Sequence, residues 1–426
     1  MTRSGAKTPF VAIACGGTGG HLFPGLAVAA ELKKCGCKTA LLISPKEIDQ
    51  QAVKTARDME IFTLPAVGLQ NRNYFPFAGS FVKSLFAVRK IFRRCKPSAV
   101  LAMGGFTSAP PVFVAKDLSA KTFLHESNTI PGRANRFLAR FVDETFIGFP
   151  GAAAHLRARK VTVTGTPVRP EFDFEKLAIS NRQSAIEKCR AALGLDPHRP
   201  TILVMGGSQG ASGLNDMILS ALPFLQERGQ LIREAGWSGE HADKLSALQF
   251  LHLTGTNDFE KVKAAYDTRG IKTVVKPFLA EMDQALGAAT VAVSRAGASS
   301  LAEIAAMRLP SLLVPFPAAA DNHQYYNARA FEATGAARLL EQKKATPGEV
   351  AAILGELAGD ETTRAAMQTA LAQWHAPRAA EQIAENILSA VFRGADSLSA
   401  RLTQDVDSRT SRPRSDEPKQ SQVCAT

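Results

Sequence analysis

The sequence predicts an α/β protein built from two doubly wound, Rossmann-like domains that face a central cleft. Length is the first reason, because 426 residues exceed what a single hydrophobic core usually holds. The second reason is that one local pattern occurs twice: a buried strand, a glycine turn and a helix follow one another near residue 10 and again near residue 202. We also expect a C-terminal helix to cross back to the first domain.

These two patterns divide the chain into domains. Between them, residues 173–199 are charged and rich in turn residues, which is typical of a linker. Near the end, Ile383, Ile387 and Val391 share one face of a predicted helix, and after Arg393 large apolar residues become rare. We therefore expect a first domain over 9–168, a linker over 169–199, a second domain over 200–376, a helix over 377–392 that packs on the first domain, and a disordered tail over 393–426.

The pattern in the second domain predicts an anion site. Residues 202–205 form a short apolar strand that stops at paired glycines from Gly206, and a helix with Leu214 and Ile218 on one face follows Gly210. Unpaired N–H groups and the positive end of the helix dipole attract a negatively charged ligand at such a place. Glycine lets a phosphate approach the backbone without meeting a Cβ atom.

The pattern in the first domain runs from a strand over 10–15 through a glycine turn over 16–20 to a helix over 26–34, and the next strand covers 38–43. Its glycine spacing differs from the dinucleotide fingerprint. No acidic residue follows the second strand where a ribose partner belongs, and a Ser-Pro pair stands there instead. This argues against NAD as a ligand.

Composition narrows the classes of partner. Hydrophobic residues make up 45% and charged residues 21% of the chain, as in ordinary soluble proteins. The formal net charge is +12 and the charges of the tail nearly cancel, so the excess positive charge lies in the folded part and favours an anionic partner.

The six cysteines and eight histidines show no metal-ligand spacing, so we expect no metal and no cofactor. No uncharged stretch could span a bilayer without glycine and proline interruptions, which predicts a cytosolic protein or one that lies on a membrane.

Residues 72–96 mix phenylalanine with arginine and lysine and contain no acidic residue. On a helix, Phe81 and Phe92 fall on one face, and Lys83 and Lys90 fall on another. One interpretation is a helix that packs on the core and has a solvated basic back; the other is a surface helix that rests on anionic lipid. RNA fits less well because bases stack mainly on sheets and loops, so we expect no nucleic acid partner. The candidates for membrane contact are Phe75, Phe81, Lys83, Phe86, Arg89, Lys90 and Arg93.

A strand over 121–126 brings polar side chains to its carboxyl end. His125, Glu126 and Asn128 lie there, and doubly wound sheets bind their ligands at such ends. The alternative is that His125 and Glu126 cap a helix over 133–139.

A second acidic candidate follows the predicted strand over 290–294. Ser300 and Glu303 match the capping box S-x-x-E, which would give this glutamate a structural role. A carboxylate at this position can also accept hydrogen bonds from both hydroxyls of a ribose. We favour the second use, because the N-terminus of this helix opens onto the predicted cleft.

Six short motifs occur in order: GGTGGH at 16–21, HESN at 125–128, GTPVR at 165–169, GGSQG at 206–210, RAGASSLAE at 295–303 and HQYYN at 323–327. Together they resemble the MurG family of UDP-N-acetylglucosamine transferases, which are inverting enzymes of the GT-B fold. The resemblance runs from about residue 9 to about residue 392. One departure is Thr166, where the family usually has Asn.

The resemblance implies a site for UDP-GlcNAc between the domains. It implies that uracil lies near Leu279, that Glu303 holds the ribose, and that Ser208 and its turn hold the diphosphate. Gln324 and Asn327 would contact the hydroxyls of GlcNAc. The full set implied for this donor, with Arg169 completing the site, is Thr18, Gly19, Gly20, Asn128, Arg169, Ser208, Gln209, Leu279, Ala298, Ser299, Ser300, Leu301, Glu303, Gln324 and Asn327.

The implied reaction moves GlcNAc from UDP-GlcNAc to the C4 hydroxyl of MurNAc in lipid I, which gives lipid II for peptidoglycan. We expect His21 as the catalytic base, with Glu126 as the second candidate. Helix N-termini can stabilise the leaving diphosphate without a metal.

The resemblance implies a peripheral protein at the cytoplasmic face of the bacterial inner membrane. It implies lipid I and an anionic membrane surface as partners, and it allows other cell-wall synthesis proteins as further partners. The alternatives are another GT-B transferase with a different sugar or a soluble acceptor, a UDP-GlcNAc epimerase, and a nucleotide-sensing or RNA-binding protein.

Overall fold

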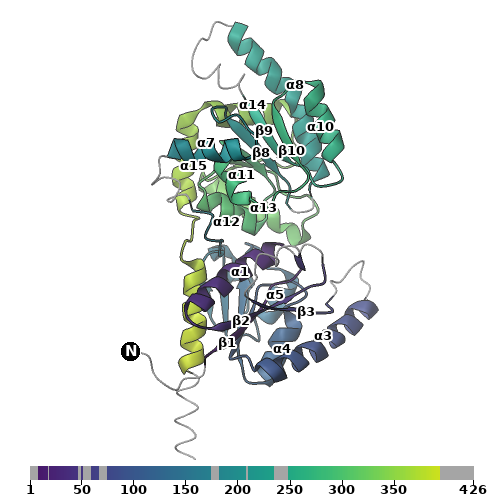
Figure 1. Ribbon diagram of the computed structural model, residues 1–426, viewed down its shortest axis with the longest axis vertical. Coiled ribbons are helices and arrows are strands. Elements are labelled where there is room, and N and C mark those ends of the chain that lie inside the picture. Colours follow the sequence, from purple (N-terminus) through teal and green to yellow (C-terminus); the bar gives the residue numbers. More distant parts are fainter. Residues whose placement is uncertain are drawn as a thin grey trace, which may run out of the picture.

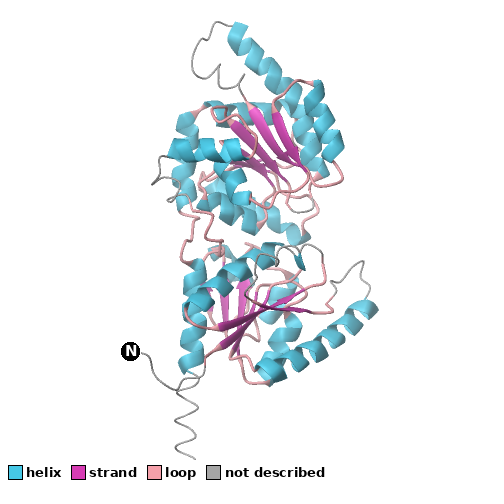
Figure 2. Cartoon of the chain, in the orientation of Figure 1, coloured by secondary structure: helices cyan, strands magenta, loops and turns pink. Residues whose placement is uncertain are grey.

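The structure is a computed structural model that describes residues 8–17, 19–46, 49–50, 59–66, 74–173, 182–207, 210–234 and 248–393. Two sheets, each covered by helices, lie one above the other along the long axis (Figure 1). Figure 2 shows that the strands of each sheet form a central layer between helices. The predicted pair of doubly wound domains is therefore confirmed. Outside the described residues lie the predicted tail from 394 onward and, among the predicted site residues, Thr18, Ser208 and Gln209.

The first domain contains a seven-stranded parallel sheet in the order β3-β2-β1-β4-β5-β6-β7. Its central strands are buried on both faces, which explains why they are continuous apolar runs. The strands are β1 (Phe10–Ala14), β2 (Lys38–Ile43), β3 (Glu60–Thr63), β4 (Ala99–Ala102), β5 (Lys121–Glu126), β6 (Glu144–Ile147) and β7 (Val161–Val163), and the helices are α1 (Gly19–Lys34), α3 (Tyr74–Cys95), α4 (Ala109–Asp117), α5 (Arg133–Leu138) and the 3₁₀ helix η2 (Pro150–His155).

The second domain repeats this arrangement with six parallel strands in the order β10-β9-β8-β11-β12-β13. Its strands are β8 (Thr201–Met205), β9 (Gln249–Leu253), β10 (Thr273–Lys276), β11 (Val291–Ser294), β12 (Ser311–Leu313) and β13 (Arg338–Leu339). Its helices are α7 (Arg182–Ala192), α8 (Ser212–Glu234), α10 (Phe259–Thr268), α11 (Met282–Ala288), α12 (Ala298–Ala306), η3 (Ala320–Asn322), α13 (His323–Ala333), α14 (Pro347–Gly359) and α15 (Glu361–Ala372).

In both sheets the strand order reverses beside the first strand of the domain. The reversal falls between β1 and β4 in the first domain and between β8 and β11 in the second. Ligands of such sheets bind outside the carboxyl ends of the strands at this reversal. Both glycine turns found in the sequence follow the carboxyl ends of these first strands, so the fold places them where a ligand is expected.

The last helix, over residues 379–393, packs on the first domain. Ile383 and Ile387 are fully buried in the same cluster as Val11 and Leu22. The chain thus crosses between the domains twice, once after β7 and once before this helix (Figure 1). Gly165 allows the two crossings to approach, because a Cβ atom there would lie 2.3 Å from the Cβ of Ala376.

Helix α1 starts earlier than predicted. We expected a helix from Leu26, but the structure begins it at Gly19, with Pro24 inside. The prediction was wrong because it treated every residue of the glycine turn as non-helical. The first turn of a helix needs no intrahelical N–H partner, so glycines cost less there than in the middle.

Helix α3 covers part of the first domain with one of its faces. Val88 and Phe92 are fully buried, which confirms the core-packing interpretation for that face. Phe81 is half-buried, so it is a weaker membrane candidate than the exposed residues of this helix. The side chain of Phe75 lies outside the described residues. Within the described ranges, no helix has the length and apolar character needed to span a bilayer.

Candidate active site

The first glycine turn is held by a buried carboxylate that the sequence analysis missed. Asp49 Oδ2 accepts hydrogen bonds from the backbone N–H of Gly17 at 2.7 Å and from the N–H and hydroxyl of Ser44. At Gly16, a Cβ atom would lie 2.3 Å from the nitrogen of Ser44. The acidic residue sought directly after β2 is thus present a few positions further on, and it binds the turn itself.

His21 follows this turn and lies in the first turns of α1. Its imidazole packs on the glycines after β4, since a Cβ atom at Gly104 would be 3.0 Å from His21 Nε2. Burial lowers the pKa of His21 to about 4, and the Asp49 carboxylate opposes the shift. The charge of His323, in the second domain, lowers the pKa further. His21 is therefore neutral near pH 7, which is the form a general base needs.

The Glu126 carboxylate is fully engaged by its own loop. Oε1 accepts from the N–H of Asn128 at 2.8 Å and from its side-chain amide at 3.0 Å. Oε2 accepts from the N–H of Gly132 at 3.0 Å and from Asn135 Nδ2 at 2.8 Å. A catalytic base needs a lone pair facing the substrate, so this geometry argues against Glu126 as a base. It supports the alternative in which Glu126 organises the start of α5.

His125 has a structural position as well. Its ring is fully buried, and Nε2 lies 3.1 Å from the carbonyl oxygen of Gly165, in the segment that leaves the first domain. Burial lowers the pKa of His125 to about 4. In the same segment the side chain of Thr166 is buried over Gly148, where a Cβ atom would lie 2.3 Å from its hydroxyl oxygen.

Asn327 joins the two domains. Its Oδ1 accepts from the N–H of Thr129 at 2.8 Å, and its Nδ2 donates to Asn128 Oδ1 at 3.0 Å and to the carbonyl of Ala296 at 3.1 Å. The side chain is fully buried and both amide hydrogens are used. We expected Asn327 to contact the sugar, but in this structure it serves the domain contact.

A second tie between the domains involves α1 and α12. Pro24 has no N–H to bond the carbonyl of Gly20, four residues earlier in α1. That carbonyl instead accepts a hydrogen bond from Ser299 Oγ at 3.0 Å. The proline inside α1 thus leaves an acceptor for the second domain, and it brings the first glycine turn beside the N-terminus of α12.

The edge of the interface carries charge pairs and aromatic contacts. Asp321 accepts from Arg133 at 3.3 Å and from Arg136 at 2.5 Å. Phe149, which follows β6, is buried in the core of the second domain, with its ring centroid 5.3 Å from that of Trp374. No local sequence pattern indicated these contacts.

Arg169 and Glu303 lie near each other at the junction of the domains. The Arg169 guanidinium lies 4.5 Å from the ring of Phe23 and 4.9 Å from that of Phe172, and it pairs with Glu171 at 3.0 Å. Burial raises the pKa of Glu303 to about 7, and the charge of Arg169 opposes the shift. No described residue donates a hydrogen bond to this carboxylate.

The capping-box alternative for Glu303 is wrong. Helix α12 begins after Gly297, which has no side-chain cap, so Ser300 lies inside the helix and cannot be its N-cap. The N–H groups at the start of α12 are therefore available to a ligand. Ala298 and Leu301 are buried, while Ser299 and Ser300 are half-buried beside this helix end.

The remaining donor residues follow strands of the second sheet. Leu279 is buried after β10. Gln324 Oε1 accepts from the N–H of Phe316 at 2.9 Å. Gly207 and Gly210 flank the undescribed part of the second turn with φ of 95° and 74°, a conformation that favours glycine. In the described part of the chain, no group of three or more His, Cys, Asp or Glu side chains could hold a metal ion.

Comparison with known families agrees with this geometry. Residues 11–147 match the glycosyltransferase family 28 N-terminal domain, and residues 201–383 match the glycosyltransferase family 28 C-terminal domain. The chain belongs to glycosyltransferase family 28. The two family 28 domains coincide with the two sheets.

Individual relatives indicate which activity within the family this chain resembles. A protein of Anaeromyxobacter sp. (strain Fw109-5), named UDP-N-acetylglucosamine--N-acetylmuramyl-(pentapeptide) pyrophosphoryl-undecaprenol N-acetylglucosamine transferase, is 35% identical over 378 residues, which cover 88% of this chain and 91% of the relative. The crystal structure of Acinetobacter baumannii MurG is 24% identical, with 90% and 100% of the chains covered and a TM-score of 0.66. UDP-GlcNAc 2-epimerase from Neisseria meningitidis is 13% identical, with 90% and 100% covered and a TM-score of 0.62. The two solved structures show the shared fold. The 35% identity to the Anaeromyxobacter transferase favours GlcNAc transfer over epimerisation.

Proposed function

We propose that this family 28 enzyme transfers GlcNAc from UDP-GlcNAc to the C4 hydroxyl of MurNAc in lipid I, with inversion, to give lipid II. The observation that carries the proposal is the contact between the first glycine turn and α12, through Gly20 and Ser299. It brings a neutral imidazole from one domain and a free helix N-terminus from the other to one interface. The printed name of the Anaeromyxobacter relative supplies the substrate pair.

The second domain would bind the donor. In this assignment, Glu303 accepts hydrogen bonds from the ribose hydroxyls, and the start of α12 with the turn around Ser208 binds the diphosphate. Leu279 would lie beside uracil, and Gln324 would contact the sugar through its amide nitrogen. The half-buried carboxylate of Glu303, to which no described residue donates, supports this arrangement, because such a group gains from a ligand that donates to it.

The first domain would bind the acceptor and supply the base. His21 takes the proton of the C4 hydroxyl as the oxygen forms its bond to the anomeric carbon of GlcNAc. The bond from that carbon to the diphosphate oxygen breaks, and the electron pair leaves with UDP. The helix N-terminus and Arg169 would stabilise the charge that develops on the diphosphate.

The face of α3 that points away from the core would contact the membrane. Phe86 is 70% and Val82 48% exposed, and Lys83, Lys90 and Arg93 are exposed around them. Apolar side chains among cations suit the headgroup region of an anionic lipid surface. Arg89 contributes less, because it pairs with Asp117 at 2.6 Å. We propose a peripheral position at the cytoplasmic face of the inner membrane, where other cell-wall synthesis proteins could also bind.

A transfer assay tests the activity. Purified protein is incubated with radiolabelled UDP-GlcNAc, with and without lipid I in detergent. Label in the lipid product only when lipid I is present supports the proposal. Label in a UDP-sugar epimer would indicate an epimerase, label in a soluble acceptor would indicate another GT-B transferase, and no turnover would indicate a binding protein.

A further inference from the structure

A cavity lies at the opposite edge of the second sheet from the candidate active site. Its volume is about 380 Å³. It is lined by Thr290, just before β11, and by Pro310, just before β12, so it faces the amino ends of these strands. The donor-site candidates follow the carboxyl ends of the same strands. The cavity is therefore separate from the site of the proposed transfer.

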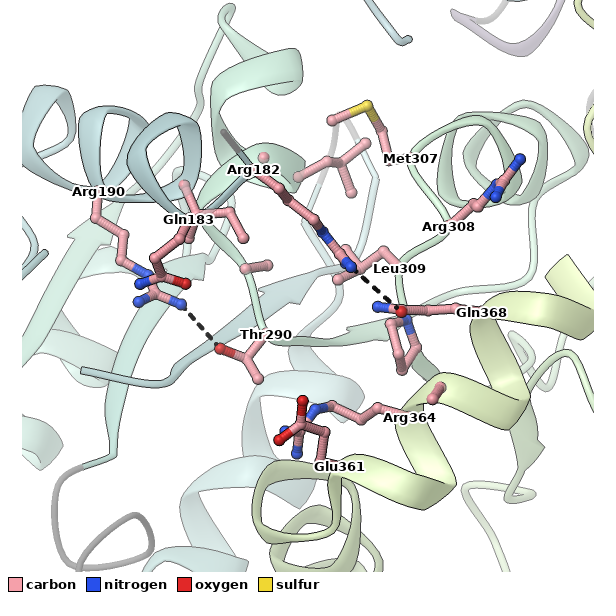
Figure 3. A pocket seen from close by; sticks show the side chains of 16 residues that line it. Arg182, Gln183, Arg190, Thr290, Met307, Arg308, Leu309, Glu361, Arg364 and Gln368 are labelled. Carbon is pink, nitrogen blue, oxygen red and sulfur yellow. Dashed lines mark hydrogen bonds between the residues drawn. The ribbon is translucent and has the colours of Figure 1, made fainter. Parts of the chain in front are cut away.

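Arginine side chains from three parts of the second domain line this cavity (Figure 3). Arg182 and Arg190 come from α7, Arg308 follows α12, and Arg364 comes from α15. Among the residues that line the cavity, Glu361 is the one carboxylate. The lining thus carries an excess of positive charge.

Two of these arginines are held in place by the protein backbone. Arg190 donates to the carbonyls of Ala288 and Pro197, each at 2.9 Å, and to Thr290 Oγ1 at 3.0 Å. Arg364 donates to the carbonyls that end α14, those of Leu357 at 3.0 Å and Ala358 at 2.7 Å. Neutral carbonyls orient a guanidinium but do not cancel its charge. These bonds therefore fix positive charge at the cavity before any ligand arrives.

The other two arginines add to this charge. Arg182 lies across the cavity from α15, where its Nη1 is 3.4 Å from Gln368 Oε1 (Figure 3). Burial lowers the pKa of Arg182, and repulsion by Arg308 and Arg364 lowers it further. Arg182 is thus close enough to Arg308 and Arg364 to feel their charge, and an anion bound beside it would offset this repulsion.

We propose that this cavity binds a small multivalent oxyanion, either a phosphate ester or a di- or tricarboxylate. Guanidinium groups present paired N–H donors that match the oxygens of both groups. The volume falls within the range of small-molecule sites, roughly 300 to 1,000 Å³. The site would bridge α7, near the place where the chain enters the second domain, and α15, near the place where it returns to the first.

Calorimetry with the full chain tests this site. The donor site is first saturated with UDP, and inorganic pyrophosphate or citrate is then titrated in. We expect binding of at least one probe in the presence of UDP. Binding of pyrophosphate alone would identify a phosphate site, binding of citrate alone a carboxylate site, and binding of both a general oxyanion site.

Two variants change the charge in opposite directions. Arg182→Gln should weaken the probe about tenfold or more, because a charge-assisted hydrogen bond is lost. Glu361→Gln should strengthen it several-fold, because it removes the one carboxylate of the lining and Glu361 is exposed, so folding is not at risk. UDP affinity should stay unchanged in both. The proposal is overturned if neither probe binds beside UDP, or if the probe affinity is the same in the wild type and in Glu361→Gln.

Discussion

The two domains share a strand order but differ at the edge where they meet. In the first domain, the two carboxylates at this edge are bonded within the domain: Asp49 holds the turn at Gly17, and Glu126 holds the loop that follows β5. In the second domain, α12 starts without a side-chain cap and the Glu303 carboxylate has no described donor. The carboxylates of the first domain are thus already satisfied, whereas the Glu303 carboxylate of the second domain can gain hydrogen bonds from a ligand.

This difference has an energetic consequence. A buried carboxylate without a hydrogen-bond donor is costly, and its proton affinity rises in response. A ligand that donates to it recovers part of that cost. The first domain has no such cost at Glu126, because four hydrogen bonds satisfy that carboxylate. We therefore expect substitutions in the first domain to affect the chemical step and substitutions in the second to affect donor binding.

The largest effect should come from His21→Ala. Loss of a general base typically slows the chemical step about 10²- to 10⁴-fold, and UDP affinity should stay within about twofold because the donor side is intact. Since burial lowers the pKa of His21 to about 4, the wild-type rate should not fall on the acid side until the pH drops well below 6.5, the ordinary value for histidine. Measuring kcat against pH checks both points. A normal kcat in His21→Ala would remove His21 as the base.

The next effect should come from Glu303→Gln, which should weaken UDP about ten- to a hundredfold, the usual cost of losing hydrogen bonds to a charged group. The pKa of Glu303 is raised to about 7, and a donating ribose would favour the ionised form. UDP binding should therefore strengthen more steeply in the wild type than in Glu303→Gln as the pH rises through 7, because both share the ionisation of the UDP phosphate and only the wild type adds that of Glu303. Calorimetry on both sides of this pH checks the slope, and equal slopes would contradict the ribose assignment.

The same Glu303 affects stability with a defined sign. Its pKa in the folded state is about 7, above the ordinary glutamate value of 4.5, so the folded state binds more protons than the unfolded state between pH 4.5 and about pH 7. Stability without ligand is then lost as the pH rises through this window. The decrease in stability with rising pH should be smaller in Glu303→Gln than in the wild type. Thermal melts of both proteins at several pH values measure this difference.

Local pattern was enough to predict several strands, among them β1, β2, β5, β8 and β11, because parallel strands that are buried on both faces are short apolar runs between turns. It also located both glycine turns. It failed where partners are distant in sequence. Asn327 binds Asn128 and Thr129, and nothing within its own segment specifies which partner a buried amide will take. Asp49 was missed for the same reason, since its role depends on how the segment after β2 folds back on the turn.

A smaller effect is expected from Asn327→Ala, which breaks the contact between the two sides. It leaves the N–H of Thr129 and the side chain of Asn128 without this partner, so the closed arrangement should lose about 1–3 kcal/mol. We expect a roughly tenfold lower transfer rate and more hydrolysis of UDP-GlcNAc, because water reaches the donor more often. The control is Asp321→Asn, at the exposed edge of the interface, where ion pairs contribute little. Equal ratios of hydrolysis to transfer in both variants would count against a specific role for Asn327.

The smallest effect on the isolated enzyme should come from Phe86→Asp, which changes α3 far from both sides of the domain interface. Phe86 is 70% exposed among cations, so the substitution should reduce flotation with vesicles that contain anionic lipid, by a factor of several. Transfer to an acceptor in detergent should remain near the wild-type rate. Phe224→Asp is a matched control, because Phe224 is 45% exposed on α8 of the second domain. If both variants lost flotation equally, the attachment would depend on general hydrophobicity; if neither did, the membrane surface would have to lie elsewhere than on α3.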